Sequence, residues 1–283
     1  MKTKHELIEE YNKTVNDIQE GNYVNLLGDV IDFPRFGKLK RGTKKYDTIG
    51  KISDYPTYSE TKIYTENIDT FLKAKELGPS CAVLNMASER TPGGGVTKGS
   101  RAQEEELCRR SNLIYSLYSF TSLGKKLFGF DNTDKSQYPI SVYGGIYSPG
   151  VCVYKTPNNY NPIDTPYTCS VISVAGIIHP KIDPTTGMML KKYVHIVKEK
   201  IRTILRIAII NGHSKLVLGA LGCGAFKNPP KHIALIFKQV LEEKEFSRSF
   251  EEICFAILDD GNSGREHNPD GNFKPFVDVF GIK

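Results

Sequence analysis

From about residue 60 onward, short apolar runs alternate with amphipathic stretches, and this alternation limits the possible folds more than any other feature. The runs at 81–86, 169–178 and 215–221 have the length and composition of buried strands. Residues 188–211 instead repeat apolar side chains at the helical period, with Val194, Val197, Ile201, Ile204, Leu205 and Ala208 on one side. Alternating strands and helices predict an α/β fold, with helices on both faces of one sheet.

The remaining segments complete this outline. Leu7, Ile8, Tyr11, Val15 and Ile18 recur near the helical period, so the first twenty residues should form a polar helix. We expect further strands at 61–66 and 253–258, a hairpin at 140–155 turning at Ser148-Pro149-Gly150, and an exposed loop at 157–167. Further helices should cover 67–77, 102–119, a segment that begins at Pro230, and part of the C-terminal tail.

Composition excludes several classes of protein. With 39% hydrophobic and 25% charged residues in 283, the chain is neither disordered nor a membrane bundle. No run approaches the roughly 18 apolar residues that a membrane helix needs, and the N-terminus lacks the apolar centre of a secretory signal. We therefore expect a cytoplasmic protein with one domain over 1–283, in which 1–60 is an N-terminal extension and 60–283 carries the motifs.

The six cysteines and six histidines are scattered, without CxxC pairs or metal-ligand spacing. This favours reduced thiols and predicts neither a bound metal nor a cofactor. The net charge of +6 is explained by solubility better than by an anionic partner. For the basic stretch at 38–45 we favour a solvated loop over a contact with a polyanion.

The first loop that points to chemistry covers residues 85–112. Gly93, Gly94 and Gly95 follow a buried strand, and they let the backbone approach a ligand closely and present its N–H groups. The next helix opens with Gln103-Glu104-Glu105-Glu106. Acids in a first turn also complement the helix dipole. Because neighbouring helical residues point about 100° apart, the three acids cannot share one role.

The second such loop covers residues 219–230. Gly222, Cys223, Gly224 and Ala225 form a small-residue turn between a strand and a helix, which suits a diphosphate held on backbone N–H groups. Phe226 either stacks on a base or ribose or fills the core. Cys223 is better interpreted as a small buried residue than as a thiol nucleophile, because its loop contains no histidine.

Together these motifs resemble those of the poly(ADP-ribose) glycohydrolase family of macrodomain-fold proteins, in its microbial type. That family has three glycines, six to eight residues, and then Gln-Glu-Glu; here seven residues separate Gly95 from Gln103. VLNMAS and GCGAF are similar to the strand before the first loop and to the diphosphate-binding loop. The resemblance runs from about residue 60 to the C-terminus, and Met86, Thr91 and Glu106 depart from the common pattern.

The resemblance implies a macrodomain-like three-layer α/β/α sandwich with a mixed central sheet and an N-terminal helical extension. It implies an enzyme that binds ADP-ribose and hydrolyses the O-glycosidic ribose–ribose bonds of poly(ADP-ribose), without a cofactor. Glu105 would be the general acid/base and Glu104 would hold ribose hydroxyls. The substrate-binding residues would be Asn85, Gly93, Gly94, Gly95, Val96, Gln103, Gly222, Cys223, Gly224, Ala225 and Phe226.

Other functions stay open at this point. A non-catalytic ADP-ribose reader would keep the cleft without the chemistry. ADP-ribosylated macromolecules, including nucleic acid, are alternative substrates, and the charge leaves direct binding of nucleic acid undecided.

Overall fold

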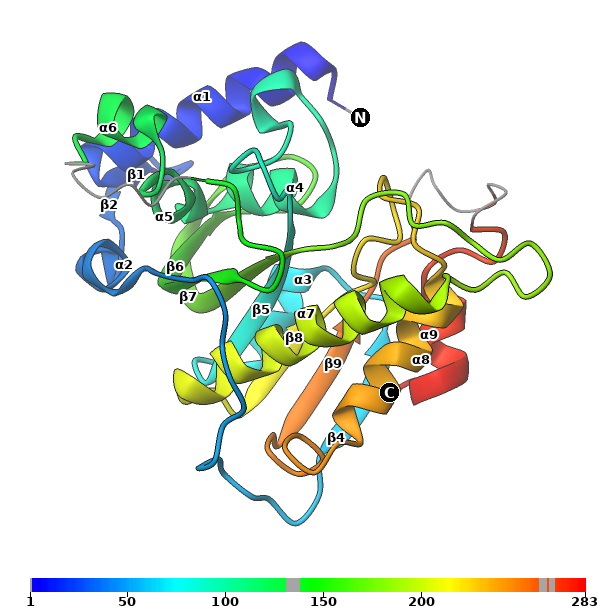
Figure 1. Cartoon of the computed structure of the whole chain (residues 1–283). Coiled ribbons are helices and arrows are strands. Elements are labelled where there is room, and N and C mark those ends of the chain that lie inside the picture. Colours follow the sequence, from blue (N-terminus) through cyan, green and yellow to red (C-terminus); the bar gives the residue numbers. More distant parts are fainter. Residues whose placement is uncertain (1, 131–137, 260–263, 265–267) are drawn as a thin grey trace.

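The computed structural model describes residues 2–130, 138–259, 264 and 268–283. Helices and strands alternate along most of this length (Figure 1). The helices are α1 Lys4–Glu20, α2 Phe36–Gly42, α3 Thr70–Leu77, the 3-10 turn η1 Val96–Lys98, α4 Gln103–Arg110, α5 Leu113–Tyr118, α6 Ser122–Phe128, α7 Lys191–Ile210, α8 Pro230–Leu241 and α9 Phe273–Phe280. The strands are β1 Asn22–Val24, β2 Val30–Asp32, β3 Lys44–Tyr46, β4 Lys62–Glu66, β5 Cys81–Ala87, β6 Gly145–Lys155, β7 Pro162–Ala175, β8 Lys215–Leu218 and β9 Glu252–Ala256.

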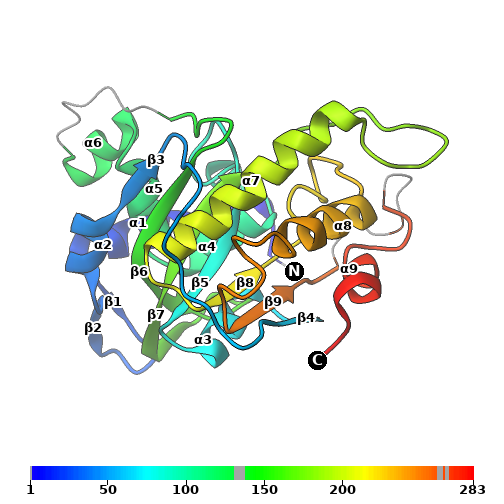
Figure 2. The ribbon, with the colours of Figure 1, turned by 60° about the horizontal axis from the view of Figure 1, so that its bottom comes forward.

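One seven-stranded mixed sheet forms the centre of the protein (Figure 2). Its order is β3-β6-β7-β5-β8-β9-β4, while β1 and β2 pair separately. β7, β5, β8, β9 and β4 are parallel to one another, and β6 is antiparallel to both β3 and β7. The carboxyl ends of β7, β5, β8 and β9 therefore lie along the same edge.

Two apolar clusters cover the two faces of this sheet. On one face, Val83 and Cys254 pack with residues of α1, α3, α4 and α5. On the other, Leu84 and Phe255 pack with residues of α7 and α8. The opposite orientation of Val83 and Leu84 follows from the two-residue period of a strand. These layers confirm the predicted three-layer α/β/α sandwich with a mixed sheet.

The single helix predicted over 102–119 is wrong, because the chain forms α4 and α5 with a break between them. At the break, Ser111 forms a bridge to Val153, and Asn112 exchanges two hydrogen bonds with Cys152 at 2.8 and 3.2 Å. Pairing with β6 thus replaces helical hydrogen bonding at Ser111 and Asn112, and the partner strand lies about 40 residues further along the chain.

The hairpin predicted at 140–155 is also wrong. β6 runs straight through Ser148-Pro149-Gly150, with a shift of register against β7 between Ser148 and Val151. Pro149 and Gly150 lie at a β-bulge. Proline and glycine are common both in bulges and in turns, so the residue types alone do not distinguish the two. Its partner β7 begins at Pro162, so the loop predicted over 157–167 is shorter than expected.

The basic stretch at 38–45 is not a loop, since it lies in α2 and β3. The ammonium group of Lys40 lies 4.4 Å from the ring centre of Phe36 and 5.7 Å from that of Tyr115. Packing of lysine stems on aromatic rings lets a strongly basic segment form regular structure.

The predicted N-terminal helix is confirmed as α1. Thr3 begins it with a capping box, in which its hydroxyl accepts from the N–H of Glu6 and the Glu6 carboxylate accepts from the N–H of Thr3. The division into an extension and a motif-bearing part stays a prediction. Among the described residues, no helix is long and apolar enough to cross a membrane.

Candidate active site

The two glycine-rich loops predicted from the sequence meet at the carboxyl edge of the sheet. The first follows β5 and the second follows β8, its parallel neighbour. A Cβ atom added to Gly219 would lie 3.3 Å from Cε of Met86, and one added to Gly176 would lie 3.0 Å from Cα of Gly222. The chain segments after β5, β7 and β8 are therefore side by side, as expected where parallel strands end together.

The first loop wraps its backbone around two carboxyl groups. Gly93 and Gly94 have φ values of 73° and 58°, a region that suits glycine. The N–H of Gly93 donates to Glu104 at 3.2 Å, and the N–H of Gly95 donates to Glu105 at 2.7 Å. A Cβ atom on Gly94 would lie 2.6 Å from Oε1 of Glu105 and 3.0 Å from Oε2 of Glu104. The glycine run thus lets both carboxyl groups approach one turn of backbone.

Glu104 is enclosed and held on both oxygens. Its Oε2 accepts the N–H of Ser88 at 2.6 Å, and its Oε1 accepts from Asn85 and Gly93 at 3.4 and 3.2 Å. Burial raises the pKa of Glu104 to about 8, and the nearby charge of Glu105 acts in the same direction while the N–H donors oppose both. Glu104 therefore tends to keep its proton at a higher pH than an ordinary glutamate.

Glu105 differs from Glu104 because one of its oxygens is unused. Oε1 accepts from Gly95, whereas Oε2 is buried and has no hydrogen-bond partner within the described residues. A buried oxygen without a partner is uncommon and needs an explanation. Oε2 is the carboxyl oxygen of the pair that is available to exchange a proton with a bound molecule.

Gln103 and Glu106, which flank the carboxyl pair in the sequence, form hydrogen bonds outside the glycine loop. Gln103 accepts from the N–H of Met86 at 2.8 Å and donates to the carbonyl of Leu84 at 2.8 Å, so it ties α4 to β5. Glu106 accepts the Tyr160 hydroxyl at 2.7 Å and pairs with Arg109 at 3.0 Å. Two acids thus face the glycine loop, and the third holds the surrounding structure together.

Asn85 lies inside the site, at the end of β5. Its amide donates to Ser173 at 3.0 Å and to Glu104 at 3.4 Å. Its carbonyl oxygen is buried and, in the described part of the chain, has no partner. Asn85 therefore places a second unsatisfied acceptor close to the carboxyl pair.

The second loop presents its backbone differently from the first. The N–H groups of Gly93, Gly94, Gly95 and Val96 all donate to protein acceptors. By contrast, the N–H groups of Gly224, Ala225 and Phe226 form no hydrogen bond with any described residue. The predicted anion-binding turn thus leaves three adjacent donors unused, as a binding site for phosphate oxygens requires.

Asn228 fixes this turn, and the sequence reasoning did not identify it. Its amide donates to the carbonyls of Ile177 and Gly222 at 2.6 and 2.9 Å, which joins the loops after β7 and β8. The sequence signal that could have identified Asn228 is its position two residues after the GCGAF turn. Phe226 is half-buried, with its ring 3.5 Å from the Cβ position of Gly176.

Cys223 is fully buried in the same turn, and burial raises the pKa of its thiol. A protonated, inaccessible thiol is a poor nucleophile. Within the described residues, no cluster of three or more His, Cys, Asp or Glu side chains could hold a metal ion.

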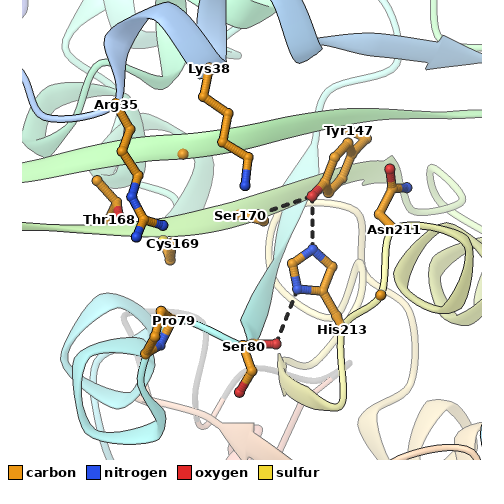
Figure 3. A pocket seen from close by; sticks show the side chains of 12 residues that line it. Arg35, Lys38, Pro79, Ser80, Tyr147, Thr168, Cys169, Ser170, Asn211 and His213 are labelled. Atoms are coloured by element: carbon orange, nitrogen blue, oxygen red, sulfur yellow. Dashed lines mark hydrogen bonds between the residues drawn. The ribbon is translucent and has the colours of Figure 1, made fainter.

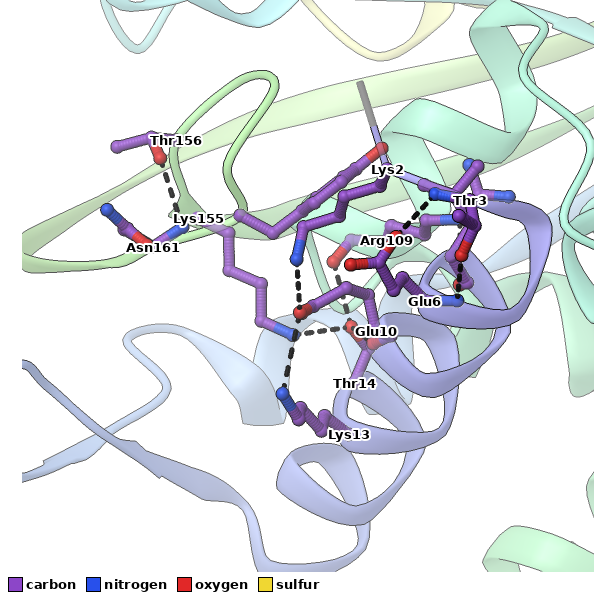
Figure 4. A network of polar contacts seen from close by, with 12 residues as sticks. Lys2, Thr3, Glu6, Glu10, Lys13, Thr14, Arg109, Lys155, Thr156 and Asn161 are labelled. Atoms are coloured by element: carbon purple, nitrogen blue, oxygen red, sulfur yellow. Dashed lines mark hydrogen bonds and ion pairs between the residues drawn. The ribbon is translucent and has the colours of Figure 1, made fainter.

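The N-terminal helix supports the first loop from outside (Figure 4). Lys155 of β6 donates to the Thr14 hydroxyl at 2.8 Å, and this hydroxyl donates to the Arg109 carbonyl at 2.8 Å. Burial lowers the pKa of Lys155 to about 8, while Asp17 at 3.6 Å acts in the opposite direction. A Cβ atom on Gly99 would lie 2.5 Å from the carbonyl oxygen of Lys4. Thus α1 packs directly on the segment between the glycines and α4.

The fold and this site define the class of protein. Two buried carboxyl groups, one with an unused oxygen, lie beside a turn that offers three free N–H groups at the carboxyl edge of a mixed sheet. These are the parts of a glycoside hydrolase that acts on a phosphate-bearing substrate.

Comparison with known proteins identifies the family. The sequence model described as the catalytic domain of microbial-type PARG, poly(ADP-ribose) glycohydrolase, matches residues 12–156. The chain therefore belongs to the microbial-type poly(ADP-ribose) glycohydrolase family and is a glycosidase. The match includes the first loop and begins inside the segment that we predicted to be an extension. Among curated proteins no match was found.

Solved structures agree with this assignment. The poly(ADP-ribose) glycohydrolase from Thermomonospora curvata superimposes with a TM-score of 0.79 and 26% identity, over 98% of this chain and 100% of that one. The same enzyme bound to the inhibitor ADP-HPD gives 0.73 and 25%, over 97% and 99%. The enzyme from Deinococcus radiodurans in complex with ADP-ribose gives 0.64 and 26%, over 88% and 98%.

Proposed function

We propose that this chain hydrolyses the O-glycosidic ribose–ribose bonds of poly(ADP-ribose) and releases ADP-ribose. The observation that supports it most is the carboxyl pair around Gly94, in which Oε2 of Glu105 has no partner in the described part of the chain. Family membership and the similar structures with ADP-ribose and ADP-HPD support the same activity.

Glu105 acts as general acid and then as general base. In the first step its carboxyl proton moves to the bridging oxygen while the bond from that oxygen to the anomeric carbon breaks, leaving an oxocarbenium-like ribose. In the second step a water molecule attacks the same carbon and returns a proton to Glu105. Oε2 of Glu105 has no hydrogen-bond partner among the described residues, so it is the carboxyl oxygen free to exchange the proton with the bridging oxygen and the water.

Glu104 and Asn85 position the ribose. Both oxygens of Glu104 are fixed by N–H donors, so this carboxyl group can accept hydrogen bonds from ribose hydroxyls without turning. The unpaired Oδ1 of Asn85 is a further acceptor beside it. Effective positioning of reacting groups accounts for a large part of enzymatic rate acceleration, so these contacts are expected to contribute to kcat.

The diphosphate binds mainly on the second loop in this proposal. The free N–H groups of Gly224, Ala225 and Phe226 suit its oxygens, with Gly222 and the buried Cys223 shaping the turn. The ring of Phe226 packs on the adenosine side. Gly93 to Val96 contact the distal ribose through backbone surface, since their N–H groups are already engaged within the protein.

We extend the proposal to partners and location. Poly(ADP-ribose) and ADP-ribosylated macromolecules are the proposed partners, and the macrodomain name for the fold remains a prediction. A cytoplasmic location is supported by six cysteines that are all free and buried. Fractionation of cells that express the protein would test the location.

The activity test compares the wild type with two matched variants of one helix, Glu105→Gln and Glu106→Gln. Each is incubated with poly(ADP-ribose) and with a serine-linked mono-ADP-ribosylated peptide, free ADP-ribose is quantified, and binding of ADP-ribose is measured by calorimetry. We expect Glu105→Gln to bind ADP-ribose but to lose at least 10²-fold in turnover, which is the scale of general acid/base catalysis. Glu106→Gln should keep its turnover.

Three results would contradict the proposal, each in a different part. Binding by the wild type without release from any O-linked substrate would leave a non-catalytic reader. Equal turnover by Glu105→Gln and the wild type would remove Glu105 from the mechanism. Release from the peptide but not from the polymer would replace the proposed substrate with a mono-adduct.

A further inference from the structure

A pocket lies at the opposite end of the sheet from the carboxyl pair. Twelve described residues line a cavity of about 170 Å³. Ser80 directly precedes β5, and His213 lies just before β8, so the pocket marks the amino ends of the strands whose carboxyl ends carry the two loops. β5 alone spans about 20 Å at roughly 3.3 Å per residue. The pocket is therefore separate from the candidate active site.

Two basic side chains reach into this pocket from α2 and the residue before it. Figure 3 shows Arg35 and Lys38 pointing down from one side, with Ser80 and His213 on the other. A Cβ atom on Gly150 would lie 3.4 Å from Cβ of Arg35 and 3.6 Å from Cβ of Lys38. The bulge of β6 at Gly150 thus lets α2 pack closely and places both cations over the strand.

The charges of the pocket are not balanced by its own walls. None of the twelve lining residues is acidic. The guanidinium of Arg35 and the ammonium of Lys38 form no hydrogen bond or ion pair with any described residue. Both side chains remain exposed, so the pocket opens to the outside. Two cations in one concave site without a carboxylate create a positive potential that attracts an anion.

A fixed chain of hydrogen bonds forms the floor. Nδ1 of His213 donates to the carbonyl of Ser80 at 3.1 Å, so Nε2 of the neutral ring accepts from the Tyr147 hydroxyl at 2.9 Å. The Tyr147 oxygen in turn accepts from the Ser170 hydroxyl at 3.1 Å. Burial lowers the pKa of His213, and the charge of Lys38 acts in the same direction while the bond to Ser80 opposes both. The floor is therefore ordered before any ligand enters.

We propose that this pocket binds a phosphate group through Arg35 and Lys38, at the end of the sheet opposite the active site. A guanidinium fork and an ammonium are the side chains that recognise phosphate oxygens best, and Thr168 adds a hydroxyl at the same wall. The cavity is smaller than the roughly 300–1,000 Å³ of sites for drug-sized ligands, so it suits a phosphate group rather than a whole dinucleotide.

The pocket also accounts for part of the basic stretch at 38–45. Lys40 packs on Phe36 and Tyr115, and Lys45 pairs with Asp47 at 3.6 Å. Lys38 instead points into the pocket (Figure 3).

The phosphate group that binds in this pocket could come from either of two sources. One is a free phosphate or a phosphomonoester. The other is a phosphate within a long ADP-ribose chain that extends across the protein.

The first experiment uses inorganic phosphate as the probe. Calorimetric titration at constant ionic strength compares the full-length wild type with the double variant Arg35→Gln/Lys38→Gln and with Lys44→Gln, an exposed control from the same basic stretch that does not line the pocket. Titrations are repeated with excess ADP-ribose, to block the second loop. We expect the double variant to bind phosphate at least ten-fold more weakly, and the control to stay within two-fold of the wild type.

The second experiment separates the two sources. If KM for long poly(ADP-ribose) rises at least three-fold in the double variant while kcat is unchanged, the phosphate belongs to the polymer. If phosphate binding is lost and KM stays constant, the ligand is a free phosphate or monoester. Equal phosphate affinity in the wild type and the double variant, or no binding by the wild type, overturns the inference. Both substitutions are remote from the carboxyl pair, so the phosphate titration is independent of whether the chain cleaves poly(ADP-ribose), whereas the KM comparison rests on that proposed activity.

Discussion

Replacing Gly94 with alanine tests the idea that the glycine loop exists to bring backbone against two carboxyl groups. The added Cβ atom would lie 2.6 Å from Oε1 of Glu105, whereas ordinary contact begins at 3.4 Å, so the carboxyl group must retreat by roughly 0.8 Å. A displacement of about 1 Å in a catalytic group reduces turnover on the order of 10²-fold, or about 2.7 kcal/mol. We expect kcat/KM of Gly94→Ala to fall by that factor.

The same substitution should affect stability only modestly. Alanine at a φ of 58° destabilises the folded protein by about 1 kcal/mol, which lowers the thermal midpoint by roughly 2–4 °C. Gly28→Ala is the matched control, because Gly28 has a φ of 91° and no atom of a described residue lies within 4 Å of its Cβ position. It should show a similar loss of stability and full activity.

Release of ADP-ribose from the polymer, measured beside calorimetric binding and thermal melting, gives all three quantities for both variants. A folded Gly94→Ala protein that keeps more than half of the wild-type kcat/KM would refute the steric argument. So would a loss of activity in Gly28→Ala of the same size, because the effect would then come from backbone strain in general.

Three further predictions concern single residues of the site. The folded-state pKa of Glu104, about 8, lies above its ordinary value of 4.5, so the folded chain retains a proton that the unfolded chain loses. Stability should therefore fall as pH rises from about 4.5 to 8, and thermal midpoints should show a flatter slope in Glu104→Gln. Glu106→Gln leaves the fully buried Arg109 without its ion pair, so chemical denaturation should show a loss of about 1–3 kcal/mol, while kcat changes less than three-fold. Cys223→Ala should keep at least half of the wild-type turnover, and the native thiol should resist alkylation; a variant that binds ADP-ribose but is inactive would restore the nucleophile hypothesis.

The alternation of apolar runs and amphipathic stretches was enough to predict the layers, because each pattern has its own period. β5, β8 and α7 fall where these periods place them, and Pro230 begins α8 as expected at a first helical position. The spacing of three glycines and Gln-Glu-Glu predicted the family, which the comparison confirms.

Local patterns failed where a distant segment competed for the same backbone. Ser111 and Asn112 are residue types that can begin a helix, but they also occur inside one, and pairing with Val153 and Cys152 of β6 decides that α4 and α5 are divided here. Pro149 and Gly150 suit a turn and a bulge equally well, and the partner strand β7 decides between them. Strand pairing depends on residues far apart in the chain, which a window of sequence does not contain.

The sequence by itself determined the fold class, the two loops and the residue types that they bring to the sheet edge, because composition and periodicity act locally. The resemblance implied different roles for Glu104 and Glu105, but only the tertiary structure shows the physical difference between them. Glu104 and Glu105 are adjacent and chemically identical, but one oxygen of Glu105 has no donor among the described residues, while both oxygens of Glu104 are held. That difference arises because β5, the glycine turn and α4 converge from separate parts of the chain, and burial, hydrogen bonding and charge then act on each carboxyl group differently.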